Sequence, residues 1–194
     1  PWLAPQNPYD LMQIDILDSR LPPGSASADG SITYHLGTDE QGRDMLSAIL
    51  YGLRISVSVG VAATVLALAI GMTLGLIAGF RGGAFDALLM RLADLQLAFP
   101  SILVAMILLA LFGQGMEKII LALVASQWAY YARTTRAAAL VERDKDYIAA
   151  ARLLGLSTPR IVLRHLLPNC LPPLIVVASL QVAAAIALEA TLSF

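Results

Sequence analysis

Three long runs of uncharged residues constrain this chain more than any other feature. They contain 26 residues between Arg54 and Arg81, 22 between Asp94 and Glu117, and 24, counting neutral His165, between Arg164 and Glu189. A helix rises 1.5 Å per residue, so about 20 residues cross the ~30 Å hydrocarbon core of a bilayer. Each run is therefore long enough to form a transmembrane helix.

A fourth segment, residues 119–132, contains only 14 uncharged residues. It crosses a bilayer only if it also uses Glu117 and Lys118 at one end and the arginines at 133 and 136 at the other, with their long side chains reaching the interface. We include it because its neighbours would otherwise need a re-entrant turn. The expected spans are about 54–80, 94–116, 117–137 and 168–190.

Composition supports a membrane protein. The chain is 58% hydrophobic and 14% charged, whereas soluble domains have about 45–50% apolar and about 25% charged residues. The expected fold is an all-α integral membrane protein, a bundle of transmembrane helices. We expect four spans here and about six in a longer parent chain, because the sequence starts at Pro1 without Met and stops at Phe194 inside an apolar run.

Few residues offer chemistry. Cys170 is the only cysteine, which excludes a disulfide framework or a multi-cysteine metal site. A net charge of −1 gives no sign of nucleic-acid binding. We therefore predict no catalytic residue, no metal site and no cofactor.

Charge asymmetry predicts the orientation. Residues 1–54 carry three basic and seven acidic side chains, and residues 133–165 carry seven basic and three acidic ones. The positive-inside rule places 133–165 in the cytoplasm. Counting back through the three spans that precede this region puts Glu117 and Lys118 outside, Arg81 and Arg91 inside, and residues 1–50 on the extracytoplasmic side. Residues 51–194 then form the transmembrane domain.

The segment before the first span is expected to be irregular and then helical. Residues 1–34 read as an extended stretch with the loop "LPPGSASADGS". Thr38 or Asp39 is predicted to cap an amphipathic helix that lies at the outer interface and leads into the first span.

Several features inside the spans predict packing. Gly71, Gly75 and Gly79 recur every four residues, a stripe that lets helix backbones approach closely in lipid. Pro100 is expected to kink the second span, and Arg91 and Asp94 are spaced to form an ion pair on one helix. The carboxylate at position 189 is expected either near the outer interface, which is the favoured place, or facing a cavity, because a carboxylate deep in lipid is costly.

The cytoplasmic region 138–167 predicts a helix–turn–helix hook. Its first helix covers residues 146–154, and Gly155 occupies the C′ position, where glycine accepts a left-handed conformation. Ser157 or Thr158 caps a second, basic helix over 159–167, with Pro159 at its first position.

A small face is predicted on the first helix of this hook, formed by Ala149, Ala150 and Ala151. Small side chains beside a sharp turn suit insertion into a groove on another protein. The hook is therefore interpreted as a docking element.

The hook resembles a cytoplasmic motif of bacterial ABC-importer permeases: Glu-Ala-Ala, three residues, Gly, nine residues, Ile-x-Leu-Pro. Aligned on Gly155, the two alanines fall on Ala150 and Ala151, and the last two positions on Leu167 and Pro168. Ala149 and His165 depart from the pattern, standing where the family has Glu and Ile.

Other segments resemble permeases of the dipeptide/oligopeptide/nickel importer family. They are "HLGTDEQGRDMLSAILYGLRISV", "GLIAGFRGG", "MRLADLQLAFPSIL", "RTTRAAALVERDKDYIAAARLLG", "LPNCLPPLIVVASL" and "ALEATLSF". The resemblance covers about residues 5–194 and is greatest to the second of the two permeases in such systems.

The resemblance implies a permease subunit that forms the path for a peptide or similar small solute in the bacterial inner membrane. The implied partners are a second permease in a heterodimer, two cytoplasmic ATP-binding subunits and an extracytoplasmic solute-binding protein. The hook would be the coupling helix. Its expected ATPase contacts are Asp146, Tyr147, Ala149, Ala150, Ala151, Arg152 and Gly155. The Walker A pattern is absent from this sequence, so hydrolysis is assigned to the partners.

Alternative functions stay open at this point. A secondary transporter would favour ionisable residues inside the spans and inverted repeats, and a membrane enzyme would need catalytic groups at membrane depth. The two histidines, His35 and His165, lie on opposite sides in the expected topology. A purely structural membrane subunit is excluded only by the hook. The solute is left open among dipeptide, oligopeptide, nickel, glutathione and others.

Overall fold

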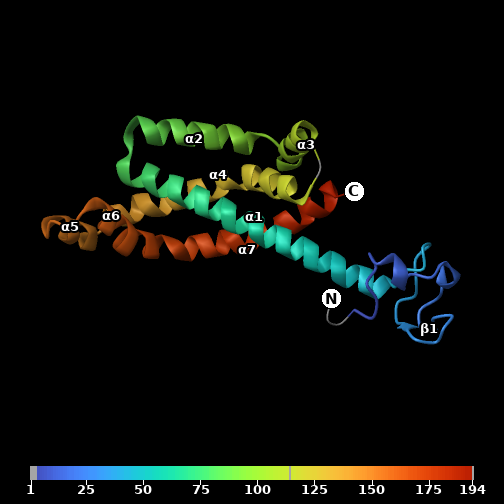
Figure 1. Ribbon diagram of the computed structural model, residues 1–194. Helices are drawn as coiled ribbons and strands as arrows, with labels where there is room; N and C mark the ends of the chain where they lie inside the picture. Colours follow the sequence, from blue (N-terminus) through green and yellow to red (C-terminus); the bar gives the residue numbers. More distant parts are fainter. Residues whose placement is uncertain (1–3, 114, 194) are drawn as a thin grey trace. The chain divides into compact units, whose positions relative to one another are not determined.

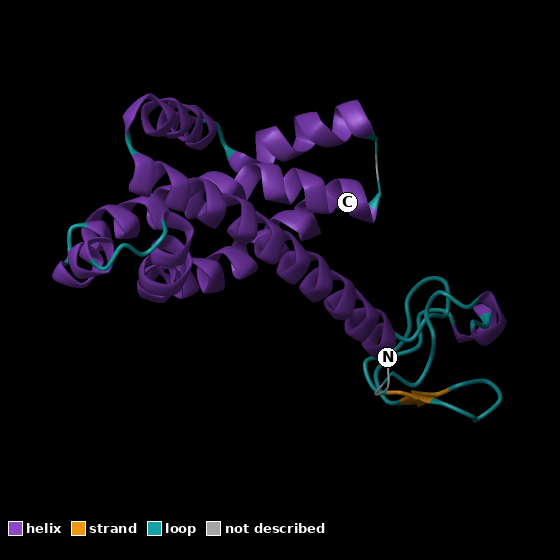
Figure 2. Cartoon of the chain, turned by 60° about the vertical axis from the view of Figure 1, so that its left-hand side comes forward, coloured by secondary structure: helices purple, strands orange, loops and turns teal. Residues whose placement is uncertain are grey.

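The computed structural model describes residues 4–113 and 115–193. It divides into two compact units, Pro1–Ser58 and Val59–Phe194, which are described separately. Helices make up nearly all of the regular structure, as Figure 2 shows, and two short strands are the exception within the described ranges. The expected all-α class is confirmed.

The first unit is folded where the sequence predicted an extended segment. It contains two short 3-10 helices, Leu11–Gln13 and Ile16–Asp18, and an antiparallel ribbon of β1 (Ser25–Ala26) and β2 (Thr33–Tyr34). The carboxylates of Asp10 and Asp15 accept backbone N–H bonds at the starts of the two 3-10 helices. These local caps give the polar sequence a defined conformation without a large apolar core.

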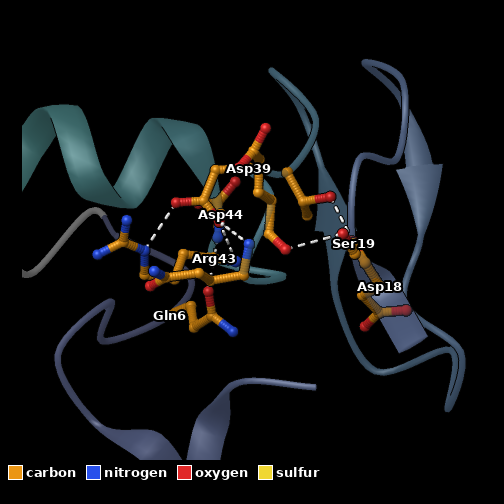
Figure 3. A network of polar contacts seen from close by, with 9 residues as sticks. Gln6, Asp18, Ser19, Asp39, Arg43 and Asp44 are labelled. Carbon is orange, nitrogen blue, oxygen red and sulfur yellow. Dashed lines mark hydrogen bonds and ion pairs between the residues drawn. The ribbon is translucent and has the colours of Figure 1, made fainter. Parts of the chain in front are cut away.

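Buried polar contacts hold this unit together. The Asp18 carboxylate accepts hydrogen bonds from the Tyr34 hydroxyl and the Ala28 N–H, both at 2.8 Å. Desolvation, together with the bond to Asp18, raises the pKa of Tyr34. Figure 3 shows the neighbouring part of the network, in which Arg43 Nε donates to Asp39 over 2.7 Å.

Helix α1 (Met45–Arg81) is a single continuous helix of 37 residues, about 55 Å long. It contains the expected span 54–80, but within residues 4–44 no separate α-helix precedes it. The cap is Asp44, whose carboxylate accepts the Ser47 N–H at 2.8 Å. The predicted cap at Thr38 or Asp39 is wrong, because Thr38 pairs with Asp44 in a β-bridge and Asp39 binds Arg43.

The next expected span, 94–116, is divided between two helices. Helices α2 (Gly83–Ala98) and α3 (Ser101–Phe112) are bent by 93° relative to each other at Phe99 and Pro100. Figure 1 shows the two helices running in different directions. Pro100 disfavours a helical conformation at the residue before it, and Phe99 is extended. The sequence predicted the position of the break but a milder kink.

Helix α4 (Met116–Arg143) is the central helix of the second unit. It packs against α2, α3 and α7 (Leu167–Leu192), and the glycines of α1 meet its backbone. Ten of its 28 residues are buried. Only α1 and Thr158–Leu192 are by themselves long and apolar enough to span a membrane among the described helices, with the α2–α3 pair as a third if it is one span.

The expected span 117–137 lies within α4. This helix is long enough to cross a membrane, but it is too polar to count with α1 and Thr158–Leu192. Neighbouring helices bury ten residues of α4, and this buried face does not need to be as apolar as a face in contact with lipid. The number of four spans stays a prediction.

Helix α7 is continuous with the segment before it. Helix α6 (Thr158–Ile161) leads through a π-turn, Val162–Leu166, directly into α7. The separate helix predicted over 159–167 and the span over 168–190 therefore form one rod. Pro168 cannot donate a helical hydrogen bond. Just before it the helix has π geometry, in which the Leu167 N–H bonds to the Val162 carbonyl five residues earlier.

Candidate functional site

The hook predicted from the sequence lies at one end of the helix bundle in Figure 1. Helix α5 (Asp146–Leu153) follows a short turn after α4 and is closed by Gly155, which has φ +70°. The Gly155 N–H bonds to the Arg152 carbonyl and the Leu156 N–H to the Ala151 carbonyl. This pair of bonds is a Schellman motif, so backbone geometry fixes the reversal.

Buried apolar residues anchor the hook to the bundle. Ile148 is fully buried, and it joins Ala151 in a cluster with Leu76, Ala139, Ile161, Leu166 and Cys170. The sequence prediction missed Ile148. Its spacing of three residues from Ala151 was the available signal, because residues i and i+3 share a helix face.

Tyr147 ties the first turn of α5 to both neighbouring helices. Its hydroxyl donates to Glu142 Oε2 over 2.6 Å and accepts a hydrogen bond of 3.1 Å from the Asn169 amide. Desolvation, followed by the bond to Glu142, raises the pKa of Tyr147 to about 12. This predicted contact residue is therefore already engaged inside the chain.

The three consecutive alanines do not form one face. Successive helix residues point about 100° apart, so Ala151 faces inward while Ala149 and Ala150 are exposed. Leu153 and Leu154 are 90% and 79% exposed. The hook tip is defined here as Ala149, Ala150, Leu153, Leu154 and Gly155. The two leucines were missed, although "LLG" in a basic cytoplasmic segment was a visible signal.

Arg152 and Asp146 border the hook tip on either end of α5. The Arg152 guanidinium lies 5.4 Å from the centre of the Phe80 ring, a cation–π contact with the last turn of α1. Both Arg152 and Asp146 stay exposed to solvent. Ser157, one of the two predicted caps, occupies the N-cap position of α6, but its side chain makes no capping hydrogen bond. The helix begins at Thr158, one residue before the predicted Pro159.

The glycine stripe of α1 lies against α4. A Cβ atom added at Gly71 would collide with the Trp128 carbonyl oxygen, and one added at Gly75 would lie 2.5 Å from that of Ala132. At Gly79 the nearest atom would be the Ala139 Cβ at 2.8 Å. The two backbones approach so closely that only glycine fits at these positions.

Ion pairs tie α2 to α4 near the hook. Asp86 accepts two hydrogen bonds from the Arg136 guanidinium, at 2.5 and 2.6 Å. Asp94 Oδ1 lies 3.3 Å from Nη1 of Arg133 on α4. The predicted pair between Arg91 and Asp94 is therefore wrong, because the neighbouring helix supplies the cation.

Glu189 lies near the C-terminal end of α7, and its expected place near the outer interface stays a prediction. Its side chain lies in α7 and is only 4% exposed, and its Oε2 atom has no hydrogen-bond partner among the described residues. The packing of α7 against the bundle has turned this carboxylate inward.

The described residues contain no group of three or more His, Cys, Asp or Glu that could hold a metal ion. The hook combines a rigid base, a fixed turn and an exposed apolar tip. Exposed apolar side chains on a rigid base make the hook tip a candidate contact surface for another protein.

Comparison with known proteins identifies the family of the chain. Residues 71–194 match the family model described as "binding-protein-dependent transport system inner membrane component". The matched range contains the α4 helix, the hook and α7.

Three relatives align over the whole chain. A di/tripeptide transport system permease protein of Pseudomonas aeruginosa is 40% identical, a dipeptide transport system permease protein of Haemophilus influenzae 38%, and a probable D,D-dipeptide transport system permease protein of Escherichia coli 39%. The chain spans 63%, 64% and 62% of their respective lengths.

Proposed function

Because the chain belongs to the family of binding-protein-dependent transport system inner membrane components, we propose that it is the permease subunit of an ABC importer. It is a multi-pass protein of the bacterial inner membrane. In this proposal it forms part of the path for a small solute and performs no ATP hydrolysis itself. Separate ATPase subunits drive the movement.

The observation that carries the proposal is the hook tip. Leu153 and Leu154 expose large apolar side chains at the end of an anchored helix. Isolated exposed leucines are common, but two adjacent ones beside Ala149 and Ala150 form a small apolar knob. An amphipathic helix that presents such a knob suits a hydrophobic groove on a partner.

The base of the hook supports transmission of force. Ile148 lies in the bundle core, Tyr147 bonds to α4 and α7, and Arg152 contacts α1. A partner that moves α5 would therefore move three long helices with it. We propose that ATP-driven closure of two ATPase subunits pulls the hooks of two permeases together and opens the path alternately to each side.

The partners and the solute are part of the proposal. A second permease would complete the path, two ATPase subunits would bind the hooks, and an extracytoplasmic binding protein would deliver the solute. The three relatives named above are called permeases for di/tripeptides, dipeptides and D,D-dipeptides. Short peptides are therefore the solute class we propose.

The test uses the full-length protein, purified from membranes in which its genomic neighbours are co-expressed. We expect an ATPase subunit to co-purify with the native chain. Gly155→Pro should release it while the protein still inserts, since Pro cannot adopt φ +70°. If no ATPase accompanies even the native chain, the proposal fails and a secondary transporter becomes the function to test.

A further inference from the structure

An apolar groove lies at the hook end of the bundle, between the last turn of α1 and the start of α6. It is lined by Leu76, Ile77, Phe80, Arg81, Thr158, Pro159 and Val162 and has a volume of about 590 Å³. This volume lies within the roughly 300–1,000 Å³ of ordinary ligand sites. Five of the lining side chains are apolar, and the single charge is the Arg81 guanidinium.

Two guanidinium groups border the groove. Arg81 is part of its lining, and Arg152 lies 5.4 Å from the centre of the Phe80 ring, which is also in the lining. Neither arginine takes part in an ion pair among the described residues. The groove therefore combines an apolar floor with positive charge that no protein carboxylate neutralises.

The position of the groove limits what can fill it. Arg81 ends the apolar helix α1, and the charge asymmetry of the sequence places this end of α1 at the cytoplasmic face. Acyl chains meet phosphate headgroups at this depth. Arginine binds phosphate through two parallel hydrogen bonds, and basic pockets between transmembrane helices on the cytoplasmic side bind anionic lipid headgroups.

We propose that this groove binds an anionic phospholipid of the inner leaflet, with an acyl chain over Ile77, Phe80 and Val162 and the phosphate at Arg81. The lipid would sit between α1 and the base of the hook. Its binding would be independent of the transported solute.

The experiment measures lipid binding to the purified full-length assembly by native mass spectrometry, with phosphatidylglycerol and phosphatidylcholine added in turn. The native protein should bind phosphatidylglycerol more tightly. Arg81→Gln should lower that affinity about fivefold, the effect of removing one arginine near a lipid headgroup. Arg91→Gln is the matched control, because Arg91 is exposed on α2 outside the groove. Equal losses in the two variants would mean general surface attraction and would overturn the proposal.

Two further arms separate the remaining occupants. Val162→Thr keeps the side-chain shape but replaces a methyl group with a hydroxyl. If an acyl chain lies on the groove floor, this change should weaken the binding of both lipids equally. Inorganic phosphate should fail to displace phosphatidylglycerol. Displacement by phosphate alone, or a groove that binds lipid only after the ATPase subunits are removed, would contradict a lipid site. These measurements do not depend on transport. The lipid site can therefore be disproved while the permease function stands, and the permease function can be disproved while the lipid site stands.

Discussion

The Leu156 N–H donates to the Ala151 carbonyl oxygen over 3.2 Å, and this bond turns the chain back at the end of α5. Gly155 stands between the two residues with φ +70°. The hook tip is therefore held by main-chain geometry before any partner binds, and it does not have to be ordered by docking.

Gly155→Ala tests that rigidity with a single methyl group. A Cβ at this position would meet no atom within 4 Å, so the cost is the left-handed conformation alone, about 1 kcal/mol. We expect association with the ATPase subunit to weaken about fivefold. Gly30→Ala is the matched control, because Gly30 has φ +71° and equally open surroundings in the first unit. If both variants weakened association with the ATPase subunit equally, the hook turn would have no special role in docking.

Gly75→Leu tests the close approach of α1 and α4. The new Cβ would lie 2.5 Å from the Ala132 carbonyl and 2.7 Å from the Thr135 Cβ, so the helices must separate. We expect a loss of about 1–3 kcal/mol or more of stability, seen as a lower midpoint of thermal unfolding in detergent. Gly52→Leu, with no atom within 4 Å, should change the midpoint little. A neutral Gly75→Leu would show that the two backbones are farther apart.

Asp86→Asn tests the ion pair between α2 and α4. It leaves the Arg136 guanidinium, whose side chain is 32% exposed, without its charged partner. We expect a stability loss of about 1–3 kcal/mol. Asp94→Asn breaks a pair whose side chains are each more than half exposed, so its effect should stay below about 1 kcal/mol. Chemical or thermal unfolding of both variants gives the comparison, and the reverse order of effects would contradict this structure.

Glu189→Gln tests the buried carboxylate of α7. Its Oε2 atom lacks a hydrogen-bond partner among the described residues, and a buried polar atom without a partner is costly. A neutral side chain of nearly the same shape should therefore raise, or at least preserve, the thermal midpoint of the purified protein. A clear drop would mean that Glu189 has a cationic partner in the full assembly.

The sequence predicted an element correctly where a local feature required it, such as a long uncharged run, a glycine at a helix end or a proline. The uncharged run after Arg54 became α1, Gly155 became the hook turn and Pro100 became a break. These positions could be predicted because each depends on a local property of the sequence. A membrane span needs an uncharged run, a left-handed residue favours glycine, and proline interrupts a helix.

Long-range contacts explain the errors. Asp94 pairs with Arg133 and not Arg91, because α4 packs against α2. The N-cap of α1 is Asp44, and not Thr38 or Asp39, because of contacts within the first unit. The exposure of Leu153 and Leu154 depends on which face of α5 Ile148 anchors. None of these follows from local spacing.

The most direct test of the account is a photo-reactive crosslink from the hook tip in the full-length assembly. Leu153→Cys would carry a photo-reactive maleimide, in a background where Cys170 and any further cysteine of the full-length protein are replaced by Ala. Arg91→Cys on α2 and Met12→Cys in the first unit would serve as exposed controls. Docking of the hook predicts a crosslink from position 153 to an ATPase subunit, which neither control gives. A label at position 153 that reaches only lipid, or no ATPase subunit at all, would contradict the coupling role of the hook.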